Sequence, residues 1–214
     1  MPTNSTFSFH FLRLGFLAVI AAIFTMPASA AEEFNEKDWP CAQRLVPELM
    51  LSTVWEGPSL EGHDKWWQDE AVSVTVGELT DPTLTEAEST EIVDKFVETY
   101  KGDKNDALLS VFSGVFEKSG YERRKQLKGI LKYVNQQRGI TKEIARISKE
   151  MRKRRKEGMT SEMEEMKLLT QTLEWNTRVY DERDKLTVYL CEEPVLLEQR
   201  LGFHSRAIMK HLKK

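Results

Sequence analysis

The feature that most constrains the fold is a pair of long segments with helical periodicity that meet near Gly158. In both segments apolar residues recur at intervals of three and four, which places them on one face of an α-helix. From about residue 121 these residues are Leu127, Ile130, Leu131, Val134, Ile140, Ile144, Ile147 and Met151. In residues 161–190 they are Met163, Met166, Leu169, Leu173, Tyr180 and Leu186. Two such helices with a short connection predict a long antiparallel hairpin over about residues 121–190.

Three shorter helices are expected around this hairpin. Thr85 and Glu88 form a capping-box pattern ahead of an apolar run, which predicts the start of a helix. Further helices are expected over about residues 106–118 and 195–212. We therefore predict an all-α bundle of about five helices within a helical domain of residues 83–214. Polar residues interrupt the heptad-like spacing of the long pair, so a bundle seam is favoured over a simple two-stranded coiled coil.

The region of residues 31–82 lacks sustained helical periodicity and carries turn signals such as Gly57-Pro58 and Asp81-Pro82. Within it, residues 71–76 read Ala-Val-Ser-Val-Thr-Val, in which apolar and small polar side chains alternate. That alternation is typical of a half-buried β-strand. We predict a mostly irregular, acidic segment with one short strand that wraps over the helices.

Residues 1–30 have the three-part layout of a secretory signal. Arg13 precedes an apolar stretch at residues 14–24, and Ala28-Ser29-Ala30 forms a small-residue cleavage site. The apolar stretch would rise only about 16 Å as a helix, well short of a hydrocarbon core about 30 Å thick. Cleavage is therefore favoured over retention as an anchor. We expect a periplasmic or secreted chain without a transmembrane segment after cleavage.

The chain contains two cysteines, Cys41 and Cys191, which lie 150 positions apart. An oxidising compartment favours a disulfide bond between an even pair of thiols. Such a bond would tie the front of the processed chain to its C-terminal helices. A redox role would need a neighbouring cysteine, as in C-x-x-C, and neither residue has one. Two unpaired thiols are the remaining alternative.

Motifs of several enzyme and cofactor classes are absent from the sequence. It contains no G-x-S-x-G elbow, no Gly-rich phosphate loop and no C-x-x-C-H haem site. A carboxylate-bridged di-iron bundle needs Glu-x-x-His. Leu or Ile stands three positions before His63, His204 and His211. We therefore expect a protein that is not an enzyme and has no resident cofactor.

One spacing could bind a metal. Met159, Met163 and Met166 follow an i, i+4, i+7 pattern, which would place three thioethers on one helical face. Thioethers select Cu(I), so a copper carrier is one interpretation. Packing at the tip of the hairpin is the other, because methionine fills irregular apolar gaps.

Four of the five tryptophans fall in residues 31–82, at Trp39, Trp55, Trp66 and Trp67. If exposed, these side chains could bind a small ligand or a hydrophobic partner. If buried, they would anchor a segment with little secondary structure onto the helices. Both interpretations remain open from the sequence.

Charge is distributed very unevenly along the chain. Residues 121–156 hold 14 Lys and Arg against 3 Glu, a net charge of +11, whereas residues 31–106 hold 6 against 19 acids, or −13. The densest basic run is Arg152, Lys153, Arg154, Arg155 and Lys156. In an exported chain such a surface suits an acidic protein or an anionic envelope surface rather than nucleic acid, unless the acidic segment neutralises it. We predict a binding protein that uses its charged hairpin, with a copper or small-ligand carrier as the alternative.

Overall fold

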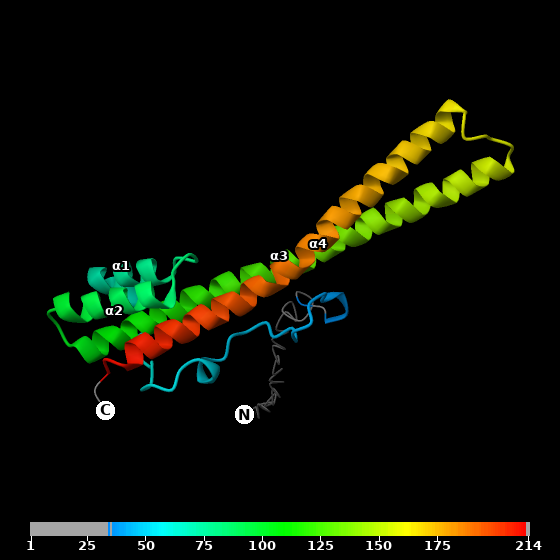
Figure 1. Cartoon of the computed structure of the whole chain (residues 1–214). Helices are drawn as coiled ribbons and strands as arrows, with labels where there is room; N and C mark the ends of the chain where they lie inside the picture. Colours follow the sequence, from blue (N-terminus) through cyan, green and yellow to red (C-terminus); the bar gives the residue numbers. More distant parts are fainter. Residues whose placement is uncertain (1–33, 35, 213–214) are drawn as a thin grey trace, which may run out of the picture. The chain divides into compact units, whose positions relative to one another are not determined.

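The computed structural model describes residue 34 and residues 36–212. It contains four α-helices: α1 (Glu70–Leu79), α2 (Glu86–Thr99), α3 (Lys104–Lys156) and α4 (Glu164–Met209). Three one-turn 3₁₀ helices precede them, at Glu36–Asp38, Leu51–Thr53 and Trp66–Gln68. Helices α3 and α4 run antiparallel, and α1 and α2 lie beside the start of α3 and the end of α4 (Figure 1). The far part of the α3–α4 pair therefore extends beyond the other helices, which confirms the predicted all-α fold with a long hairpin.

Capping residues fix where the shorter elements meet the long ones. Thr85 caps α2: its hydroxyl accepts a hydrogen bond from the Glu88 backbone N–H, and the Glu88 carboxylate accepts one from the Thr85 N–H at 2.8 Å. This is the predicted capping box. Asp103 caps α3 in the same way, because its carboxylate accepts from the N–H groups of Asn105 and Asp106.

The strand predicted at residues 71–76 is wrong, because this segment lies within α1. Val72, Val76 and Leu79 are spaced i, i+4, i+7 and are almost completely buried, whereas Val74 on the other side of the helix is 56% exposed. Asp69 begins the helix by accepting a hydrogen bond from the Val72 N–H. The hydrogen bond from the Tyr100 hydroxyl holds the pKa of Asp69 below its ordinary value, with a smaller effect from Val72. No strand occurs anywhere in the described residues.

The predicted count of about five helices is corrected to four, because two expected breaks do not occur and α1 adds a helix that was not expected. Helix α3 continues through Gly120, and α4 continues through Pro194. A glycine inside a helix costs about 1 kcal/mol relative to alanine, and a proline about 3 kcal/mol. The extensive contact between α3 and α4 offsets these costs, and Pro194 itself is buried.

The main core lies where α1 and α2 pack against the start of α3 and the end of α4. Phe112 at its centre is fully buried, and the ring of Trp55 stacks on it at a centroid distance of 4.0 Å. Trp66 and Val76 approach α3 so closely at Gly114 that a Cβ atom there would lie 2.7 Å from each side chain. Only glycine permits this approach, so the packing of α1 on α3 depends on it.

The predicted disulfide bond attaches the segment that precedes α1 to the long helices. We call this segment, residues 36–69, the front segment. Cys41 and Cys191 lie at disulfide distance, with their Cα atoms 5.5 Å apart. Beside the bond, the Gln43 amide donates a hydrogen bond to the Cys191 carbonyl. Arg123 of α3 is buried, donates to the Val46 carbonyl and pairs with Glu198 of α4 at 2.6 Å. The segment therefore lies against both helices of the pair.

No helix among residues 36–212 combines the length and apolar character needed to cross a bilayer. The predicted signal, residues 1–30, falls outside the residues that the structure describes. The cleavage prediction therefore stays a prediction.

Candidate functional site

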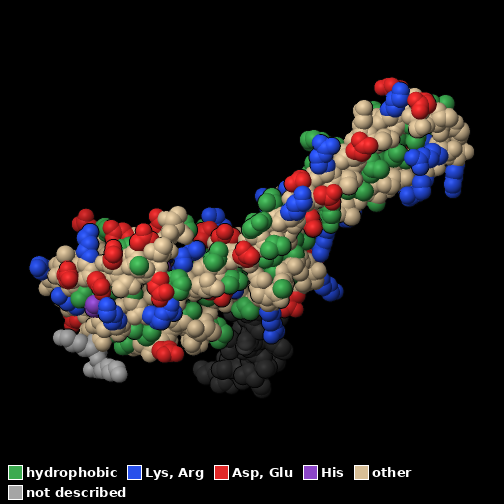
Figure 2. Space-filling view, in the orientation of Figure 1, with side chains coloured by type: hydrophobic (Ala, Val, Ile, Leu, Met, Phe, Trp, Pro, Cys, Tyr) green, Lys and Arg blue, Asp and Glu red, His purple; other side chains and the backbone are tan. Residues whose placement is uncertain are grey.

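The clearest candidate surface is a line of basic residues on the distal half of α3. It comprises Lys142, Arg146, Lys149, Lys153 and Lys156, which we call the basic stripe. Their spacing of four, three, four and three residues puts them on one face of the helix, and all five are exposed. At 1.5 Å per residue the stripe is about 20 Å long. Figure 2 shows the Lys and Arg side chains gathered at the far end of the hairpin, over the end of α3.

Ion pairs neutralise only part of this surface. Paired cations near the tip are Arg146 with Glu143, Lys153 with Glu157, and Arg154 with both Glu150 and Glu165. The Arg146 and Arg154 hydrogen bonds lower the pKa values of Glu143 and Glu150, so these carboxylates stay ionised at neutral pH. Among the cations of residues 142–156, those that form no ion pair with any described residue are Lys142, Lys149, Arg152, Arg155 and Lys156. Three of these belong to the basic stripe.

The acidic front segment forms ion pairs with α3 that stop short of the basic stripe. Glu48 pairs with Arg124 at 2.8 Å, and Asp38 pairs with Arg138. Over the described residues, ion pairs between this segment and α3 end at Arg138. The Asp and Glu side chains of α1 and α2 gather at the opposite end of the molecule from the hairpin tip (Figure 2). Within the described residues, the charges of Lys142, Lys149 and Lys156 in the basic stripe are therefore not neutralised by any ion pair.

A second exposed feature of the hairpin was missed by sequence reasoning. Leu168, Trp175, Leu186 and Tyr189 of α4 are all at least half exposed, and their intervals of 7, 11 and 3 residues place them on one face. We call them the apolar row. The seven-residue interval from Leu168 to Trp175 is the signal that could have found it. Periodicity alone had placed Leu186 in the buried seam.

The methionines do not lie along one helical face. Met166 is buried with Ile147 and Met151 in a small apolar cluster, and Met159 packs against that cluster. Met163 is exposed and is the N-cap of α4, which begins only at Glu164. Because Met159 and Met163 precede the helix, the helical spacing behind the copper hypothesis does not position their sulfur atoms. Gly158, with φ of +92°, makes the turn that leads into this connection.

The four tryptophans of the front segment occupy different environments. Trp55 is buried in the core, and its indole N–H donates to the Pro58 carbonyl at 2.7 Å. Trp39 donates to the Gln43 carbonyl, and Trp66 donates to the Glu117 carboxylate of α3 at 2.8 Å. Trp67 is 54% exposed and meets Trp66 edge to face. Three of the four therefore have contacts within the fold that account for them, and Trp67 is the most exposed of the four.

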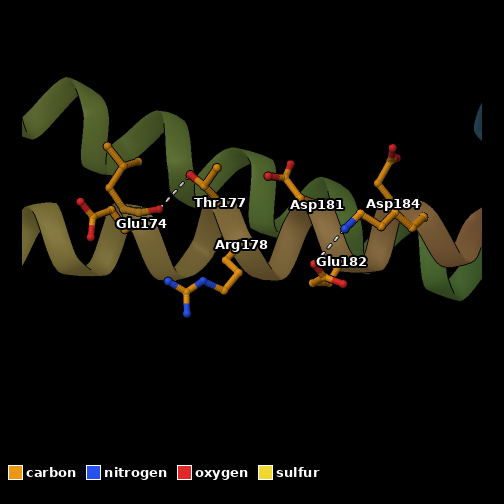
Figure 3. A pocket seen from close by; sticks show the side chains of 8 residues that line it. Glu174, Thr177, Arg178, Asp181, Glu182 and Asp184 are labelled. Atoms are coloured by element: carbon orange, nitrogen blue, oxygen red, sulfur yellow. Dashed lines mark hydrogen bonds and ion pairs between the residues drawn. The ribbon is translucent and has the colours of Figure 1, made fainter.

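A hollow on the side of α4 carries mixed charges (Figure 3). Its lining includes Glu174, Arg178, Asp181 and Lys185, and Lys185 pairs with Glu182 at 2.9 Å. All of the lining residues come from α4. A hollow built by one helix is an open surface and cannot surround a ligand.

His204, on the buried side of α4, is expected to make stability depend on pH. Burial, together with the nearby charge of Arg200, lowers its pKa to about 4 from an ordinary value near 6.5. Between these values the unfolded chain binds the proton and the folded chain does not, so folding weakens as the pH falls from about 6.5 towards 4. The full loss of folding free energy over this pH range is about 3 kcal/mol.

Urea unfolding of the wild type and of His204→Gln at pH 7.5, 6 and 5 measures this effect. The variant should lose less stability between pH 7.5 and 5 than the wild type does, because glutamine does not titrate. Equal losses in the two proteins would show that His204 is not the responsible group.

Comparison with known proteins identifies no family for this chain. No family model matches it, and no characterised protein or solved structure shows significant similarity. The functional inference below therefore depends on the surfaces and contacts of the molecule itself.

Proposed function

We propose that this chain is an exported, non-enzymatic binding protein whose hairpin holds an acidic protein partner through the basic stripe. The observation that carries the proposal is the stripe itself, in which Lys142, Lys149 and Lys156 are exposed and have no ion pair within the described residues. A surface with this charge attracts an acidic partner and speeds their encounter. Helices that extend beyond the rest of the fold also give a partner access to the stripe.

A protein partner is favoured over an anionic membrane by the state of the apolar face of α3. An interfacial helix binds by burying that face in lipid. In this hairpin Ile147 and Met151 are already buried against α4. The apolar row on α4 adds Trp175 and Tyr189, which belong to residue types that are enriched at the energetic centres of protein interfaces.

Export is supported by two features. The cysteine pair at disulfide distance suits an oxidising compartment, and the N-terminal sequence has the layout of a secretory signal. We therefore propose a periplasmic or secreted location.

The test is to replace Lys142, Lys149 and Lys156 together with glutamine. Binding to the partner should weaken about 10-fold at low salt, because each exposed charge pair contributes roughly 0.2–1 kcal/mol. The dependence on salt should also decrease, since fewer screened charges remain. The partner is captured from envelope extract at low salt, identified by mass and purified, and its Kd is then measured with each variant at about 50 and 500 mM salt.

A matched control removes the same charge at the other end of the molecule, with Lys95, Lys101 and Lys104 replaced by glutamine. These residues are also exposed, and their loss should leave Kd unchanged. Equal weakening by the two triple variants would reduce the effect to net charge and contradict the proposal. Binding of the protein to anionic lipid vesicles through the stripe, with no protein captured, would assign the hairpin to a membrane surface instead.

A further inference from the structure

A cavity of about 550 Å³ lies where the end of α1, the middle of α3 and the end of α4 meet. Its walls come from residues 79–82, 118–126 and 193–204. This volume falls within the range of roughly 300–1,000 Å³ that is typical of small-molecule sites. Unlike the hollow on α4, the cavity is built by three segments, so it can surround a ligand on several sides. It is also separate from the hairpin surface on which the proposed function depends.

The lining of the cavity contains two buried polar atoms without partners. His204 is 3% exposed, and its Nδ1 atom has no hydrogen bond to any described residue. The Gln126 Oε1 atom, which enters from α3, is likewise buried and unpaired. Burial of polar atoms without partners is unfavourable, because their hydrogen bonds to water are lost without replacement. A ligand that donates a hydrogen bond to Gln126 and reaches the imidazole would restore those bonds.

The charged residues of the lining carry both signs. Arg200, one turn before His204 on the same face of α4, is half-buried and forms no ion pair within residues 36–212. Lys118 is a second cation, and it also lies 5.8 Å from the centroid of the Trp66 ring. The acidic lining residues are Asp81, Glu122 and Glu193. Glu122 pairs with Lys125 at 3.2 Å, whereas Glu193 forms no ion pair in the described part of the chain.

We propose that this cavity binds a small zwitterion, with the size and chemistry of an amino acid or a dipeptide. The ligand carboxylate would pair with the guanidinium of Arg200, whose planar group suits two parallel hydrogen bonds to a carboxylate. The ligand ammonium would donate to Gln126 Oε1 beside the acidic lining. The three carboxylates disfavour a polyanion such as a nucleotide, and the charged walls disfavour a fatty acid.

The experiment screens pools of the common amino acids and of dipeptides, at about 5 mM each, for a rise in the Tm of the purified protein. Hits are then titrated by calorimetry. We expect at least one zwitterion to bind with a Kd below the millimolar range. Arg200→Gln should weaken its binding at least 10-fold, and Gln126→Leu about 5-fold.

Matched controls lie on exposed turns of the hairpin part of α4. Arg178→Gln and Gln171→Leu change the same residue types outside the cavity and should leave Kd unchanged. Circular dichroism of all four variants checks that they fold. The ligand amidated at its carboxylate, and the ligand acetylated at its amine, should each bind at least 10-fold more weakly.

Three results would overturn the inference. The first is the absence of any Tm shift across the pools. The second is binding that neither Arg200→Gln nor Gln126→Leu weakens, because the site would then be elsewhere. The third is equal binding of the blocked analogues or of inorganic phosphate, because the cavity would then not select a zwitterion.

Discussion

Replacing Cys41 and Cys191 together with serine is expected to lower the free energy of unfolding by about 3–5 kcal/mol. The two residues lie 150 positions apart, so the bond between them closes most of the described chain into one loop. The chain-entropy model assigns about 4.7 kcal/mol to a loop of about 100 residues, and the contribution grows slowly with loop length. Urea unfolding of the oxidised wild type and of the double variant measures the difference.

Without the disulfide bond, unfolding should begin locally, in the front segment. Without the bond, residues 36–50 are held mainly by single contacts such as the Gln43 amide on the Cys191 carbonyl and Arg123 on the Val46 carbonyl. We expect amide hydrogen exchange in these residues to accelerate before exchange in α3 does. The reduced wild type is the control, because it opens the same loop without a substitution. An unchanged urea midpoint in both proteins would mean that the bond does not contribute to stability.

The fold was predictable from the sequence where one periodic pattern extended over many turns. The seam of α3 from Leu127 to Met151 follows a single spacing, and the hairpin that it predicted is present. The pattern failed at α1, where a short segment fits two periods. Val72, Val74 and Val76 alternate as in a strand, but Val72, Val76 and Leu79 also fit a helix. Asp69, as an N-cap, is the local signal that favours the helix.

Helix ends were less predictable, because tertiary contacts decide whether a helix continues through an unfavourable residue. Gly120 and Pro194 are strong stop signals, yet both lie inside helices whose partner packs along them.

The candidate surfaces, like the helices, were predictable from the sequence only in part. The basic run near Arg152 was visible in the sequence. The length of the basic stripe was not, because it depends on which basic residues fall on one face of α3. Nothing local predicts the cavity near His204, because its walls are distant in sequence.

Replacing Trp55 with alanine is expected to cost about 3–5 kcal/mol of folding free energy, the range for removing a large aromatic side chain from a core. Trp55 is 7% exposed, and its ring stacks on Phe112 near the start of α3. The matched control is Trp67→Ala, because Trp67 is more than half exposed and its loss should cost under about 1 kcal/mol. Chemical unfolding of both variants, with the disulfide intact, measures the two costs.

The comparison separates two ways of attaching a segment that has little regular structure. The disulfide acts largely by restricting the unfolded chain, whereas Trp55 acts through packing in the folded state, so reduction and Trp55→Ala should have nearly additive effects. The two sites lie at different points of the long helices, Cys191 on α4 and Phe112 on α3. If Trp55→Ala and Trp67→Ala cost the same, the stacking on Phe112 would not anchor the segment. Sub-additive effects would instead mean that releasing one attachment already frees the other.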